Sequence, residues 1–249
     1  IYFGGNSIDN VADVVLSAEA SGNAYGLSVS AAGDVNADGY SDVIVGASFY
    51  NSGRGRAYIY FGGNTMNNIA DVIMTGAGSN DEFGREVSDA GDLNGDGFSD
   101  VAVSAPFINK IYIYYGSTTM NNVEDVLLSG VSSFAIASAG DVNGDGFSDL
   151  IAGQTFSNGN AFIYYGGEIM DNSSDITLSG EASGSSFGIS VSTAGDVNGD
   201  GFSDVIIGAI GLNSYTGKAY IFLGSEQMDV IPDVTMTGEA VNNDFGKSV

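Results

Sequence analysis

Four short segments of the chain place oxygen-bearing side chains at alternate positions and could bind a hard metal ion. They are residues 34–42, 92–100, 141–149 and 196–204, and each follows the pattern Asp-x-Asn-x-Asp-Gly-aromatic-Ser-Asp. Ca²⁺ takes about 6–8 oxygen ligands, whereas Mg²⁺ keeps more of its waters. The chain has no Cys and no His, the residues that zinc and copper favour. The pattern therefore predicts four calcium sites, and we call these segments the Asp loops.

The nine positions of each Asp loop have distinct expected roles. Positions 1, 3, 5 and 9 offer side-chain oxygens, position 7 offers a backbone carbonyl, and Gly at position 6 allows a sharp turn. About four Ca²⁺ ions are expected. The predicted ligands are Asp34, Asn36, Asp38, Tyr40, Asp42, Asp92, Asn94, Asp96, Phe98, Asp100, Asp141, Asn143, Asp145, Phe147, Asp149, Asp196, Asn198, Asp200, Phe202 and Asp204.

An EF-hand loop begins in the same way but needs a Glu at position 12. Here that position is apolar in every copy, with Val45, Val103, Ala152 and Ile207. We therefore expect the Asp at position 9 to complete the calcium site. A single Asp- and Asn-rich loop would be equally typical of an ordinary turn, but four copies in phase favour a metal site.

Other features recur with the Asp loops, at intervals of about fifty-five residues. An aromatic residue followed by a small one precedes each loop, as Tyr25-Gly26, Phe83-Gly84, Phe134-Ala135 and Phe187-Gly188, and a fifth such pair, Phe245-Gly246, lies near the C-terminal end. An apolar strand, a tyrosine-rich strand and a strand that begins with Asp follow each loop. Four short strands per repeat, without helical periodicity, predict an all-β protein whose repeats are the blades of a β-propeller. We expect the tyrosines to pack between blades.

The repeat divides the chain into four full blades and a partial blade at each end, within a single propeller segment of residues 1–249. Because the sequence begins in mid-repeat, we expect it to belong to a longer protein. The expected units are 1–17 (end of a blade), 24–75, 82–129, 133–179 and 186–237 (full blades), and 245–249 (start of a further blade).

The chain resembles the FG-GAP repeats of integrin alpha-subunit propellers and their prokaryotic relatives. The motifs that carry the resemblance are Phe187-Gly188, Asp196 to Asp204, and Gly208-Ala209. The resemblance implies a propeller of about seven blades, with calcium in the loop between the first and second strands. The GAP motif is incomplete in every copy. Ala37 replaces the usual Gly at loop position 4, which we expect to be harmless.

In integrin-like propellers the main ligand surface lies opposite the calcium loops, which implies a protein or glycan partner there. The formal net charge of −25 argues against nucleic acid, and no run of 18 apolar residues could cross a bilayer. Further blades of a longer chain, or a partner chain, would complete the ring. The implied ligand loops are 48–55, 105–110, 154–160, 209–217, 76–82, 130–133, 180–186 and 238–244.

The predicted function is that of an extracellular, non-catalytic binding or adhesion module stabilised by calcium. Two alternatives remain open at this point. One is a structural component of a surface filament or matrix. The other is the propeller part of a secreted hydrolase or lyase, in which Asp81, Glu82 or Glu181 would supply an acid pair. A Ser-His-Asp triad is impossible without His.

Overall fold

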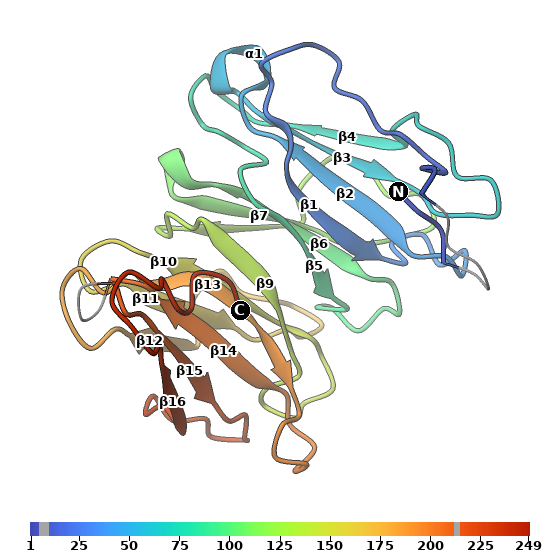
Figure 1. Ribbon diagram of the computed structural model, residues 1–249. Helices are drawn as coiled ribbons and strands as arrows, with labels where there is room; N and C mark the ends of the chain where they lie inside the picture. Colours follow the sequence, from blue (N-terminus) through green and yellow to red (C-terminus); the bar gives the residue numbers. More distant parts are fainter. Residues whose placement is uncertain (5–9, 212–214) are drawn as a thin grey trace.

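The chain folds into four antiparallel sheets of four strands each, which follow one another along the sequence (Figure 1). The computed structural model describes residues 1–4, 10–211 and 215–249. Within each sheet the strands are hydrogen-bonded in sequence order, so each sheet is one blade. The predicted all-β propeller of four-stranded blades is confirmed.

The strands are four to nine residues long. The first and second blades contain β1 (Tyr25–Gly33), β2 (Asp42–Ala47), β3 (Arg56–Tyr60), β4 (Val72–Thr75), β5 (Val87–Gly91), β6 (Asp100–Ala105), β7 (Lys110–Tyr114) and β8 (Val126–Ser129). The third and fourth contain β9 (Ala135–Gly140), β10 (Asp149–Gln154), β11 (Asn160–Tyr164), β12 (Ile176–Ser179), β13 (Phe187–Gly195), β14 (Asp204–Ala209), β15 (Lys218–Phe222) and β16 (Val234–Thr237). Two short turns, α1 (Tyr50–Gly53) and η1 (Pro106–Ile108), join β2 to β3 and β6 to β7.

Antiparallel pairing gives every blade two distinct ends. The Asp loops join the first strand of a blade to the second, and they share one end with the loops that join the third strand to the fourth. We call this the Asp end. The opposite end carries the loops between the second and third strands and the connections from one blade to the next. The loops implied as ligand-binding therefore lie together, except for residues 212–214 of the loop 209–217, which are outside the described residues.

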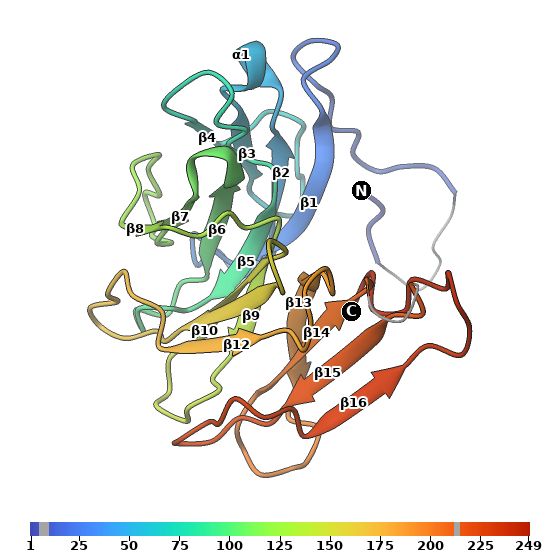
Figure 2. The same cartoon turned by 90° about the vertical axis from the view of Figure 1, so that its left-hand side faces the viewer.

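The blades pack face to face through their first strands, with β1 beside β5, β5 beside β9 and β9 beside β13 (Figure 2). The core lies between blades because each sheet buries both faces of its central strands. The repeat aromatics Phe83 and Phe187 are 1% and 2% exposed and lie 5.2 Å from the ring of Tyr112 and 5.4 Å from that of Tyr220. The strand tyrosines thus pack in the core, as expected.

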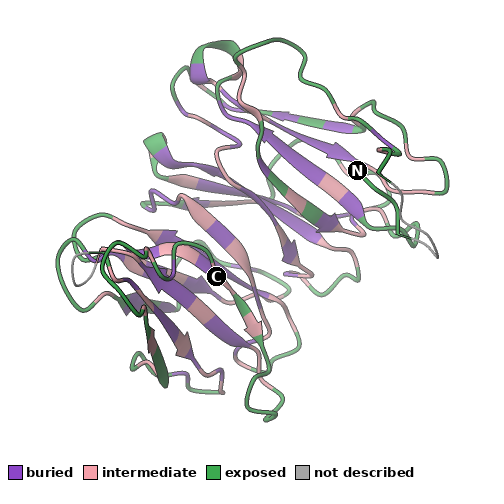
Figure 3. Cartoon of the chain, in the orientation of Figure 1, coloured by how far each residue is buried: buried purple, intermediate pink, exposed green. Residues whose placement is uncertain are grey.

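The outer faces of the first and fourth blades are partly exposed, as Figure 3 shows. Val29 in β1 is 63% exposed, whereas Val87 at the equivalent position of β5 is 2% exposed beneath the first blade. In the fourth Asp loop, Val197 is 54% exposed, although Val142 at the same position of the third loop is fully buried. Both faces therefore carry apolar positions that a neighbouring blade covers elsewhere in the chain.

The N-terminal segment lies against the open face of the first blade and reproduces part of the repeat. The backbone N–H of Asp13 donates to the carbonyl of Ile1 at 3.0 Å, and the N–H of Phe3 donates to the Asp13 carboxylate at 2.7 Å. These bonds match those between the third and fourth strands of full blades. Residues 5–9 of the predicted unit 1–17 are outside the described residues.

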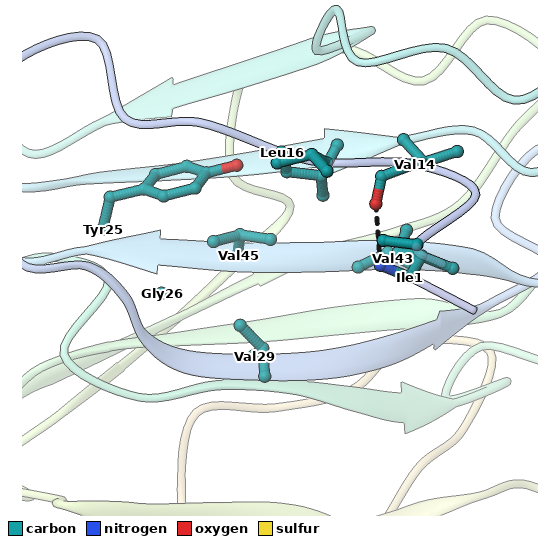
Figure 4. Close-up of a pocket in the computed structure, with 10 residues that line it drawn as sticks. Ile1, Val14, Leu16, Tyr25, Gly26, Val29, Val43 and Val45 are labelled. Carbon is teal, nitrogen blue, oxygen red and sulfur yellow. Dashed lines mark hydrogen bonds between the residues drawn. The ribbon is translucent and has the colours of Figure 1, made fainter. Parts of the chain in front are cut away.

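An apolar cavity of about 530 Å³ separates this segment from the first blade (Figure 4). Its lining includes Val14 and Leu16 on one side and Tyr25 and Val45 on the other. At the next interface the first and second strands of a blade fill the corresponding space. The cavity is thus the space that these two strands occupy in a full blade.

The third repeat differs from the prediction at its aromatic residue. Ile136 pairs with Ala152, as Val29 pairs with Val45, but only one residue separates Phe134 from Ile136, whereas three separate Tyr25 from Val29. Phe134 is only half-buried and packs on Phe107 with ring centroids 6.1 Å apart. β9 lacks the irregularity that lengthens β1 and β13, and the ring of Phe134 is less deeply buried than those of Phe83 and Phe187.

Glu86 lies at the interface between the first and second blades, directly before β5. Burial raises the pKa of its carboxyl to about 7, although a hydrogen bond with Ser28 and the nearby charge of Arg85 act in the opposite direction. The folded protein therefore holds a proton on Glu86 between pH 4.5 and 7, where the unfolded chain has largely lost it.

Replacing Glu86 with Gln should stabilise the fold at pH 8 but not at pH 4.5. Because the raised pKa makes the folded state bind more protons, the wild type loses stability as pH rises from about 4.5 to 7. Gln has no such charge to bury, so at pH 8 the free energy of unfolding of the variant should exceed that of the wild type by about 2 kcal/mol. Urea unfolding at both pH values, compared between variant and wild type, measures this. An equal effect at both values would contradict the prediction.

Candidate metal centre

The carboxylate at position 1 organises the backbone of each Asp loop. In the third loop, Asp141 Oδ1 accepts the N–H groups of Gly144 at 2.7 Å and Asp145 at 3.1 Å, and Oδ2 accepts that of Gly146 at 2.9 Å. Such side-chain to backbone bonds hold a tight turn around the carboxylate. The second and fourth loops repeat all three bonds.

Positions 3 and 5 are drawn into the same turn. Asn143 Oδ1 accepts the N–H of Asp145 at 2.9 Å, and Asn143 Nδ2 donates to Asp145 Oδ2 at 2.8 Å. Asp145 Oδ1 in turn accepts the N–H of Phe147 at 3.0 Å. The structure therefore brings the predicted ligands at positions 1, 3 and 5 together at the loop surface, and position 7 contributes its backbone N–H to the same network.

The carboxylate at position 9 lies in the protein interior. Asp149 is fully buried, with Oδ2 accepting the N–H of Val142 at 2.8 Å and Oδ1 accepting that of Gly166 at 2.9 Å. It thereby ties the Asp loop to the end of the third strand of its own blade. The same pair of bonds recurs at Asp42, Asp100 and Asp204.

Negative charge accumulates within each loop. Burial raises the pKa of both Asp100 and Asp149 to about 7; their backbone hydrogen bonds lower it, and the carboxylates at positions 5 and 1 raise it further. The pKa of Asp42 is raised by the same causes. The acids at positions 1, 5 and 9 are thus close enough to repel one another, and a cation among them would relieve that repulsion.

The donor set fits a hard divalent cation, with only carboxylate, amide and carbonyl oxygens available. Among the described residues, no three acidic side chains converge into a ready-made site. Positions 1 and 5 instead turn toward N–H groups of their own loop, while position 9 points inward. In the third loop Asp141 Oδ1 already accepts two N–H groups, but Asp141 Oδ2 and both carboxylate oxygens of Asp145 accept one bond each, which leaves acceptor capacity for a cation.

Ala37 at position 4 of the first loop is less favourable than we expected from the sequence. Its φ is 56°, in the left-handed region, where a non-glycine residue costs roughly 1–2 kcal/mol. Gly95, Gly144 and Gly199 occupy this position in the other loops, and each donates its N–H to the position-1 carboxylate at 2.7 Å. The first loop shows no such bond.

Replacing Ala37 with Gly should stabilise the protein by about 1 kcal/mol, because it relieves the strain of a left-handed backbone. Thermal unfolding should shift upward by about 2–4 °C. The matched reverse change is Gly199→Ala, where an added Cβ would meet no atom within 4 Å, so that only backbone strain is introduced. A neutral result for Ala37→Gly together with a destabilising Gly199→Ala would show that the first loop accommodates Ala without strain.

Sequence reasoning assigned no role to the Asp that begins each fourth strand. The carboxylate of Asp125 accepts the N–H of Tyr115 at 2.8 Å, across the loop between the third and fourth strands. Asp13, Asp71, Asp175 and Asp233 make the same bond. The constant spacing of ten residues between donor and acceptor was the available signal. These acids fix the second set of loops at the Asp end.

The acids considered for a catalytic pair have separate structural partners. Asp81 is 7% exposed and accepts the N–H of Gly78 at 2.6 Å. Glu82 forms an ion pair with Arg85 at 3.2 Å, and Glu181 forms one with Lys218 at 2.8 Å. Each carboxylate is therefore engaged with its own neighbour.

Comparison with known proteins agrees with this geometry. The FG-GAP repeat family matches residues 25–60 and 187–222, and the FG-GAP-like repeat family matches residues 92–152. The chain belongs to the FG-GAP repeat family. The segments 25–60 and 187–222 each contain one whole Asp loop with the strands on either side of it, and the segment 92–152 contains two Asp loops.

The curated relatives of these FG-GAP repeats include integrin alpha subunits. Integrin alpha-5 of Xenopus laevis is 31% identical over 235 residues, which cover 88% of this chain and 18% of the relative. Integrin alpha-7 of Rattus norvegicus is 41% identical over 118 residues, or 43% of this chain and 10% of the relative. The chain thus spans less than a fifth of the length of these relatives.

A solved structure, that of AofleA from Arthrobotrys oligospora, covers 86% of this chain and 59% of its own, with a TM-score of 0.45 and 12% identity. Among the described residues, no helix has the length and apolar character needed to cross a membrane.

Proposed function

We propose that this chain is the calcium-binding propeller segment of an extracellular adhesion protein, and that it binds a protein or glycan ligand through the end opposite the Asp loops. The Asp loops are the proposed cation sites, with side-chain oxygens from positions 1, 3, 5 and 9 and a carbonyl from position 7. Bound calcium would neutralise the carboxylates of each loop. Extracellular calcium would keep sites of even modest affinity filled.

The observation that carries this proposal is the separation of charge between the two ends. The Asp end carries the twelve acids of the Asp loops and the Asp at the start of each fourth strand. All six basic residues lie at the opposite end: Arg54, Arg56, Arg85, Lys110, Lys218 and Lys247. The strongly acidic end is thus suited to cations, whereas the opposite end, with mixed charge, does not repel a macromolecular ligand.

Exposed aromatic side chains mark the same opposite end. Each blade has one in the loop between its second and third strands: Phe49, Phe107, Phe156 and Tyr215 are 45%, 61%, 58% and 55% exposed. Exposed aromatic rings are enriched in recognition surfaces because they provide contact area at low entropic cost. A row of them, one per blade, supports an extended ligand-binding surface.

A non-catalytic role is consistent with the chemistry of the chain. It contains no His or Cys, the acids of the Asp loops hold the backbone, and the other acids considered are individually paired. Binding is therefore the activity that the geometry supports.

The proposal is tested by binding to an array of purified extracellular-matrix proteins and oligosaccharides in millimolar calcium. The double variant Phe107→Ser/Phe156→Ser should lose at least tenfold in affinity for any array component that the wild type binds. The matched control is Val123→Ser/Ile169→Ser, which removes residues 63% and 92% exposed at the Asp end. Loss of binding in the control but not in the aromatic variant would reject the opposite end as the ligand surface.

A further inference from the structure

Each Asp loop is in direct contact with the next Asp loop along the chain. The N–H of Ser99, at position 8 of the second loop, donates to the carbonyl of Asp34, at position 1 of the first, at 3.1 Å. The equivalent bonds join Ser148 to Asp92 at 2.9 Å and Ser203 to Asp141 at 2.8 Å. In every case the position-1 residue of the earlier loop accepts a bond from the following blade.

A second set of contacts has the same direction. An added Cβ on Gly95, at position 4 of the second loop, would lie 2.5 Å from the ring of Phe147, at position 7 of the third loop. Gly144 has the same relation to Phe202. The following blade also covers position 2: Leu93 is fully buried, and its carbonyl accepts the N–H of Gly167 at 2.7 Å.

The fourth loop shows what happens without a following blade. Val197 at position 2 is 54% exposed, and an added Cβ on Gly199 at position 4 would meet no atom within 4 Å. Its internal hydrogen bonds nevertheless match those of the second and third loops. The following blade therefore restrains the outer surface of a loop whose internal turn is already formed.

We propose that the aromatic residue at position 7 of the third and fourth Asp loops, Phe147 and Phe202, is a positioning residue for the calcium site of the preceding loop, so that calcium binding and the docking of the next blade stabilise each other. This inference rests on the proposed calcium sites. The ring packs on position 4 and the adjacent Ser holds the position-1 carbonyl, so both restrain the backbone that presents the preceding ligands. Coupling of this kind is reciprocal by linkage.

The direction of coupling can be tested with proteins that keep one working loop. In the first protein, Asp→Ala at position 5 of the first, third and fourth loops leaves only loop 92–100 intact. In the second protein, the same change in the first, second and fourth loops leaves only loop 141–149 intact. Phe147→Leu should weaken calcium binding by about 5- to 10-fold in the first protein and by less than twofold in the second, measured by calorimetry. Phe202→Leu is the matched control and should weaken loop 141–149 while leaving loop 92–100 unchanged.

Amide hydrogen exchange provides a test that needs no change in the core. With calcium present, Asp96→Ala should increase exchange at the Ser148 amide by at least tenfold and leave the Ser203 amide unchanged. The directional coupling would be overturned if Phe147→Leu weakened calcium binding only at loop 141–149. It would also be overturned if Asp96→Ala changed the exchange rates of the Ser148 and Ser203 amides equally. Absence of calcium binding by the wild type would instead reject the proposed sites themselves.

Discussion

Removing calcium is expected to lower the unfolding temperature by roughly 20–40 °C. A cation bound only by the folded state stabilises it by RT ln(1 + [L]/Kd), which is about 2.7 kcal/mol per site at a hundredfold excess over Kd. Four sites of this strength contribute on the order of 10 kcal/mol, and each kcal/mol corresponds to about 2–4 °C for a chain of this size. Circular dichroism during heating, in millimolar calcium and after chelation, measures the effect.

The control for this experiment is the quadruple variant with Asn at position 5: Asp38→Asn, Asp96→Asn, Asp145→Asn and Asp200→Asn. It removes one carboxylate from every loop while keeping the shape of the side chain, so chelation should change its unfolding temperature by only a few degrees. Calorimetry should count about four ions in the wild type. A wild type that binds no calcium and unfolds identically with and without chelator would reduce the Asp loops to ordinary turns.

The blade architecture was predictable because it is repeated. An apolar strand, a tyrosine-rich strand and a strand that begins with Asp follow each Asp loop, and the recurrence of Asp at positions 1, 5 and 9 fixes their order. Phe134 packs differently from Phe83 and Phe187 at the place where the repeat is shortened. Phe134 precedes Asp141 by seven residues, whereas Phe187 precedes Asp196 by nine, and this difference in spacing was visible in the sequence.

Contacts between repeats were not predictable in the same way. The packing of Phe147 against Gly95 joins residues that are distant in sequence, and nothing in either motif identifies its partner. The strain at Ala37 was missed for a related reason, because it depends on a positive φ set by the hydrogen-bonded turn. Composition and spacing define the repeat, while the way in which one repeat constrains the next requires coordinates.

The double role of the buried position-9 carboxylate leads to the second large expected effect. Asp149→Ala should destabilise the protein by about 2–4 kcal/mol even in chelator, because it leaves the N–H groups of Val142 and Gly166 without their acceptor. Asp145→Ala removes an exposed carboxylate from the same loop and should change stability in chelator by less than about 1 kcal/mol. In calcium, both variants should additionally lose the stabilisation that one bound ion provides.

Comparing the two variants therefore separates the architectural part of the loop from the cation site. Urea unfolding with and without calcium gives four free energies, and the difference between the variants should be the same in both conditions. If Asp149→Ala were as mild as Asp145→Ala in chelator, the buried carboxylate would serve only the ion. If Asp145→Ala lost none of the stabilisation that calcium provides, position 5 would not be a ligand. The predicted pattern requires position 9 to hold the loop against its blade before any cation binds, so that calcium acts on a turn that is already folded.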